Sequence, residues 1–88
     1  MPCYLVETFL ARSAAGERQA REGRARSAAE ALTRNGTRVS FRGSVHVPED
    51  EICFFTFEAQ SGRDAALAAH QAGLEAFRVV QAVPSTKE

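Results

Sequence analysis

The pattern of apolar and polar residues in the first part of the chain predicts a strand followed by a helix. Residues 4–10 are rich in β-branched and aromatic side chains, which favour a strand. Residues 16–34 are mostly Ala, Arg, Glu and Leu, which favour a helix, and Ser13 is a suitable N-terminal cap. The Asn35-Gly36 pair ends this helix, because both residues tolerate the left-handed backbone of a C-terminal cap.

The second part of the chain predicts two strands, a helix and a last strand. Residues 38–47 alternate between apolar and polar side chains, which indicates a strand with one buried side. Residues 52–59 form the most apolar segment, so we expect this strand at the centre of a sheet. Ser61 is positioned to cap the following helix, and Gly73 ends it. Residues 77–83 then predict the final strand.

The order strand, helix, strand, strand, helix, strand predicts a single α+β domain of the ferredoxin-like βαββαβ class. Two split βαβ units joined by a hairpin form a four-stranded antiparallel sheet with both helices on one face. We expect this domain to span residues 1–83, followed by a disordered polar tail over residues 84–88.

The helices cover only one face of such a sheet, and the other face, here called the open face, carries a mixed set of side chains. In the strand 38–47, strict alternation directs one set towards the helices, namely Val39, Phe41 and Val45. The polar set then lies on the open face, namely Arg38, Ser40, Arg42, Ser44 and His46. A one-residue change of register would move His46 to the other side. Neighbouring strands place Glu7 and Glu58 beside this row, together with Leu5, Phe9, Ile52, Phe54 and Thr56.

This open face is too apolar to remain bare in a monomer and too polar to be an ordinary core. Two such sheets packed face to face would form a dimeric α+β barrel around a cavity, and a short chain often depends on oligomerisation for stability. We therefore expect a homodimer in which a small ligand faces Glu7, Arg42, His46 and Glu58.

Composition and charge exclude several classes of function. The 88 residues include 11 basic and 11 acidic ones, so the net charge is zero and neither nucleic acid nor an anionic membrane is an expected partner. The fold order also occurs in RNA-recognition domains, but the acidic run 49–51 occupies the place of their basic motif. The N-terminus lacks a signal peptide or membrane anchor, so we expect a cytoplasmic protein with Cys3 and Cys53 reduced and unpaired.

Few residues can carry metal or catalytic chemistry. The two imidazoles, His46 and His70, are the candidate metal ligands, and no HxH, HxxxH or CxxC spacing accompanies them. Glu7 and Glu58 could act as a pair of carboxylates, or each could neutralise an arginine of the same face. No nucleophile elbow or glycine-rich phosphate loop is present in the sequence.

The chain resembles the small nickel-binding-protein-like family, ferredoxin-like proteins catalogued as a domain of unknown function. The resemblance covers roughly residues 4–83 and an Ala-rich first helix. It lies in short motifs that recur in order: Leu5-Val6-Glu7, Val45-His46-Val47-Pro48-Glu49-Asp50-Glu51, Cys53-Phe54, Phe57-Glu58-Ala59, Ala72-Gly73-Leu74 and Arg78-Val79-Val80. It implies the same fold, a homodimer, and nickel binding as in the members after which the family is named. Those members are His-rich where this chain has Glu7-Thr8 and Leu74.

These observations predict a non-enzymatic protein that binds a small ligand or a metal ion, with nickel the first candidate through the resemblance. The alternative is a cofactorless oxygenase, isomerase or cyclase that acts in a cavity between the two sheets of the dimer, an expectation that rests on fold analogy alone. A third possibility is a structural partner of another protein.

Overall fold

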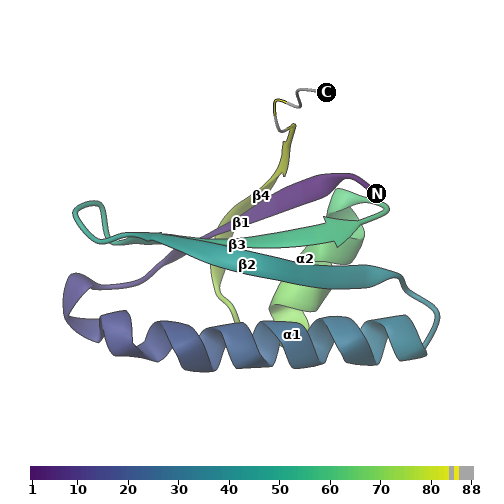
Figure 1. Ribbon diagram of the computed structural model, residues 1–88, viewed down its shortest axis with the longest axis horizontal. Helices are drawn as coiled ribbons and strands as arrows, with labels where there is room; N and C mark the ends of the chain where they lie inside the picture. Colours follow the sequence, from purple (N-terminus) through teal and green to yellow (C-terminus); the bar gives the residue numbers. More distant parts are fainter. Residues whose placement is uncertain (84, 86–88) are drawn as a thin grey trace.

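A computed structural model describes residues 1–83 and 85, and confirms the ferredoxin-like α+β fold (Figure 1). The predicted tail 84–88 lies outside the described residues apart from Ser85. The elements follow in the predicted order, with a 3₁₀ segment added before the first helix: β1 (Cys3–Phe9), η1 (Arg12–Glu17), α1 (Arg18–Arg34), β2 (Val39–Val47), β3 (Ile52–Ala59), α2 (Gly62–Gln71) and β4 (Ala76–Ala82).

The four strands form one sheet in the order β2-β3-β1-β4, and every neighbouring pair is antiparallel. The strand β3 lies in the interior of the sheet, as its apolar sequence predicts. Figure 1 shows α1 and α2 together on one side of the sheet, which leaves the open face without a covering element of the described chain. Neither described helix is long and apolar enough to cross a bilayer.

The residues that begin and end the helices act largely as the sequence predicts. The Ser61 side chain accepts a hydrogen bond from the backbone N–H of Asp64 at 3.2 Å, which caps the start of α2. Gly73 adopts a positive φ of 76° after the end of α2, a conformation that costs glycine no steric strain. The predicted cap at Ser13 is wrong, because the chain forms η1 there and no side chain caps it.

The core lies between the sheet and the two helices. The sheet contributes large side chains that are fully buried, including Phe55, Phe57 and Val6. The helices contribute small ones, namely Ala25, Ala28, Ala29, Ala65, Ala68 and Ala69. Alanines on the inner faces let both helices approach the sheet closely and cover the phenylalanine rings. Removal of each ring from water contributes about 1.5–3 kcal/mol to the free energy of folding.

A β-bulge in β2 changes which side chains reach the open face. Phe41 pairs with Phe57 and Gly43 pairs with Thr56, so that Arg42 has no direct partner in β3. Gly43 adopts a φ of 145°, a backbone conformation that other residues rarely enter. The extra residue inverts the alternation for the rest of the strand.

The bulge contradicts the predicted faces of the second half of β2. Ser44 pairs with Phe55 and His46 pairs with Cys53, both of which are buried on the helix side. Directly paired residues share a face of the sheet, so Ser44 and His46 lie beneath it and not on the open face. The expectation for Val45 is wrong in the opposite sense, because this side chain is 57% exposed on the open face.

Candidate functional site

The open face is an apolar surface that crosses all four strands. The strand pairings place Val45, Phe54 and Leu5 on this face, together with Ile52, Val47, Thr56 and Val80. Val45 is exposed, and Leu5, Phe54 and Val80 are only partly buried in the single chain. Aliphatic and aromatic side chains gathered in this way are the usual composition of a surface that binds another molecule.

Two ion pairs lie on the open face, one between each inner strand and its outer neighbour. Arg78 Nε donates a hydrogen bond to Glu7 Oε1 at 2.8 Å, linking β4 to β1. Arg42 Nε lies 3.8 Å from Glu58 Oε2, linking β2 to β3. The Glu7 and Glu58 side chains are 19% and 34% exposed, so each carboxylate is half-buried beside its arginine. Within each pair the positive and negative charges cancel.

The two carboxylates are well separated. Glu7 pairs with Phe54 and Glu58 lies four residues further along β3, which puts their strand positions roughly 13 Å apart. Two carboxylates at that distance cannot share one proton, and each already has an arginine. The arrangement is therefore suited to orienting a polar ligand or to neutralising a buried surface.

Of the four residues predicted to face a ligand, the structure brings Glu7, Arg42 and Glu58 to the open face and places His46 beneath the sheet. The ring of His46 lies with Nε2 3.1 Å from the backbone oxygen of Leu10. Nearby, Ser44 Oγ donates to Glu22 and accepts from Arg18 Nε at 2.9 Å. The contact of His46 ties β2 to the residue after β1, and the contacts of Ser44 tie β2 to the start of α1.

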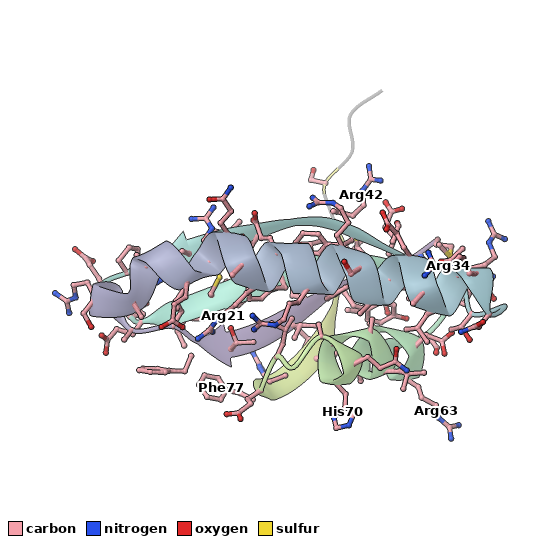
Figure 2. All side chains as sticks on the ribbon, turned by 90° about the horizontal axis from the view of Figure 1, so that it is seen from below. Arg21, Arg34, Arg42, Arg63, His70 and Phe77 are labelled. Atoms are coloured by element: carbon pink, nitrogen blue, oxygen red, sulfur yellow. The ribbon has the colours of Figure 1, made fainter. Side chains whose placement is uncertain are left out.

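His70, the other predicted metal ligand, is exposed on α2. Figure 2 shows its side chain projecting outward from α2 at the edge of the molecule, away from α1. Among residues 1–83 and 85 there is no group of three or more His, Cys, Asp or Glu side chains arranged to hold a metal ion. His46 and His70 are thus not brought into one cluster by a single chain.

Sequence reasoning missed Arg78 as the partner of Glu7. The register of β1 on β4 makes the two residues direct neighbours across the sheet. The sequence shows Arg78 next to Val79 in the last strand, so the two side chains lie on opposite faces of the sheet. Which face carries Arg78 depends on the register of β4 on β1, and this register shifts between Glu7 and Thr8. Only the paired strands could reveal this contact.

The two cysteines are unpaired, and they differ in environment. Cys3 is partly buried at the start of β1, whereas Cys53 is fully buried near the start of β3. Burial raises the pKa of the Cys53 thiol above its usual range, and the positive charges of Arg18 and Arg21 offset only part of this shift. The neutral thiol is therefore the stable form inside the core.

We expect Cys53 to resist alkylation in the folded protein. At pH 8, iodoacetamide should modify Cys3 more than about tenfold faster than Cys53, because only an exposed thiolate reacts. Since the pKa of Cys53 is raised in the folded state, its contribution to the free energy of unfolding should be constant at neutral pH and fall as the pH rises past the ordinary thiol pKa of 9.0. Mass spectrometry of peptides after timed labelling measures the rates, and equal labelling of both cysteines would contradict the buried position.

Comparison with known proteins agrees with the fold. No protein-family model matches the chain. No curated protein matches it either. Among solved structures, the chain is similar to SCO4226 from Streptomyces coelicolor A3(2), with a TM-score of 0.63 and 15% sequence identity over 96% of this chain and 99% of that one. At this identity the similarity shows a shared fold and leaves function open.

Proposed function

We propose that the protein is a homodimer joined through its open sheet faces, and that it works as a non-enzymatic binding protein with a small ligand held between the two sheets. The observation that carries this proposal is the apolar surface of Leu5, Val45, Phe54 and Val80, which no described helix or strand covers. A chain of 88 residues buries a modest share of its surface by itself, and a second copy would remove this apolar surface from water.

Charge on the open face supports a second copy as the occupant. Glu7 with Arg78 and Glu58 with Arg42 each form a neutral pair, so the same pairs of an identical surface would meet them without net repulsion. A twofold contact is self-complementary, and each patch then meets the same patch of the other chain. An acidic or basic partner protein would gain nothing from such a balanced surface.

The ion pairs also suggest how a ligand would be recognised. Arg42 is 58% exposed and Arg78 is 67% exposed at the side chain, so both guanidinium groups retain hydrogen-bonding capacity for a polar ligand between the sheets. In a space with little water these charges act more strongly than they do at an open surface. In this proposal Glu7, Arg42 and Glu58 face the ligand.

Nickel enters the proposal through the family resemblance. A nickel site would draw on His46 or His70 together with ligands from both copies, because one chain does not gather three such side chains among its described residues. We further propose a cytoplasmic location, where both free thiols would remain reduced.

The test begins with the mass of the tag-free protein by light scattering, since the chain weighs 9.6 kDa and a dimer weighs twice that. We expect the dimer at micromolar concentration. A monomer at every concentration tested would refute the proposal.

Isothermal titration of Ni²⁺ then distinguishes a metal-binding protein from one that binds a small organic ligand. Saturable binding at a fixed stoichiometry per dimer that is lost in His46→Ala and retained in His70→Ala would assign a metal site to His46. Loss in His70→Ala alone would assign it to α2. Without saturable binding, the space between the sheets should be screened with small organic molecules, with Arg42→Gln as the comparison variant.

A further inference from the structure

The two helices differ in length, and the difference leaves a pocket on the helix side of the sheet. The helix α1 has 17 residues and α2 has 10, so α1 is longer by roughly 10 Å. Figure 2 shows that α2 stops short of the end of the sheet where Arg21 and Phe77 lie. A pocket of about 710 Å³ occupies this end of the helix layer, between the first half of α1 and the start of β4. This volume is typical of sites for small organic molecules.

The pocket has aromatic side chains that the single chain leaves exposed. Phe77 is 59% exposed and Phe9 is 53% exposed, and both line the pocket. Ala20 and Ala76 add further apolar surface. Phenyl rings left in water at the edge of a pocket gain free energy when an apolar group packs against them.

The charged groups of the pocket divide into a pair bonded to each other and two exposed groups with hydrogen-bonding capacity left for a ligand. Arg21 donates to the backbone oxygen of Phe9 at 3.0 Å and to Glu17 at 3.1 Å, which occupies both of its terminal nitrogens and neutralises Glu17. Arg24 uses only Nε, which donates to the backbone oxygen of Ala72 at 2.8 Å beyond the end of α2. Its two terminal nitrogens and the carboxylate of Glu75 make no hydrogen bond or ion pair with the described residues.

The backbone holds Arg24 in place. Its bond to Ala72 fixes the guanidinium at the C-terminal end of α2, and a Cβ at Gly73 would lie 3.8 Å from Arg24 Nε. Fixing Nε in this way orients the remaining edge of the planar group, which is suited to binding a carboxylate through two parallel hydrogen bonds. Glu75 follows two residues after Gly73, so it supplies a negative charge on the same loop.

We propose that this pocket binds a zwitterionic small molecule with a large apolar body, that is, a free amino acid of aromatic or long aliphatic side chain. Arg24 binds its carboxylate, Glu75 binds its ammonium group, and Phe9 and Phe77 pack against its side chain. An anion without an ammonium group leaves Glu75 unpaired, and an amine without a carboxylate leaves Arg24 unpaired, so the balance of charges selects a ligand that carries both.

The site is formed by a single chain, and its lining residues other than Phe9 come from η1, α1 and the segment 73–77, away from Val45 and the rest of β2. Phe9 lies at the end of β1 and pairs with Ile52 of the open face. Binding should therefore persist in a variant that disrupts the open face, such as Val45→Lys. This separates failure of the pocket from failure of the proposed function.

The test is an NMR or calorimetric titration of the full chain with L-phenylalanine, together with 3-phenylpropionate, which lacks the amine, and phenethylamine, which lacks the carboxylate. We expect saturable binding of L-phenylalanine and affinities lower by roughly ten- to a hundredfold for both analogues, as expected when one charge-assisted hydrogen-bonded contact is lost. No saturable binding of L-phenylalanine, or equal affinity for either analogue, would overturn the proposal.

Variants locate the site. Arg24→Gln, Glu75→Gln and Phe77→Ala should each weaken L-phenylalanine binding by about tenfold or more, whereas Arg63→Gln, at the exposed start of α2, should leave it unchanged. Arg24→Gln removes the contact with Ala72 and could loosen the end of α2, so Glu75→Gln is the decisive variant, because Glu75 is exposed and contributes nothing to the core. Unchanged affinity in Glu75→Gln would refute the assignment.

Discussion

Val45→Lys should convert the proposed dimer to a monomer without unfolding the chain. Val45 is 57% exposed in the single chain and lies on the open face, so a lysine there costs the isolated domain little. In a twofold contact the substitution counts twice, and it places two uncompensated charges in an apolar interface. Each buried valine is worth about 1.5–2 kcal/mol and each unpaired charge costs more, so dimerisation should weaken by at least roughly a hundredfold.

Light scattering or sedimentation across a concentration series measures this change, and circular dichroism checks that the fold is intact. The matched control is Leu67→Lys, which places the same charge at a 39% exposed apolar side chain on α2. The control should behave as the wild type. Equal dissociation in both variants, or an unchanged dimer in Val45→Lys, would show that the open face is not the interface.

Gly43→Ala should lower the free energy of unfolding by about 1–3 kcal/mol. The glycine adopts a φ of 145° in the bulge of β2, and at this φ the Cβ of any other residue clashes with its own backbone atoms. No other atom lies within 4 Å of a Cβ built at this position, so the cost arises from the backbone conformation and not from crowding. Urea denaturation followed by circular dichroism gives the change in stability.

Gly23→Ala is the control for this prediction. Gly23 lies in the exposed middle of α1, where nothing surrounds an added Cβ, and alanine favours a helix by about 1 kcal/mol over glycine. We therefore expect a gain in stability from Gly23→Ala and a loss from Gly43→Ala. Equal stability of Gly43→Ala and the wild type would mean that the bulge does not depend on glycine.

The bulge also explains why strict alternation predicts the wrong face for half of β2. Strict alternation placed His46 beside Arg42 on the open face, whereas one extra residue at Arg42 moves His46 to the helix side, where its ring contacts the Leu10 carbonyl. A glycine within a strand pattern is a known sign of a bulge, so the signal was present at Gly43. Its effect on register could not be deduced, because it depends on which hydrogen bonds β3 makes on either side.

The sequence by itself determined the four strands and two α-helices, their order and the caps at Ser61 and Gly73, because these depend on local propensity and on short-range hydrogen bonds. The same local rules made β3 an inner strand through its apolar composition. Only the tertiary structure decided the partner of Glu7, the side of the sheet on which His46 lies, and the pocket beside Arg24. Each of these depends on strand register or on the relative lengths and positions of two packed helices, which are set by contacts between residues far apart in the chain.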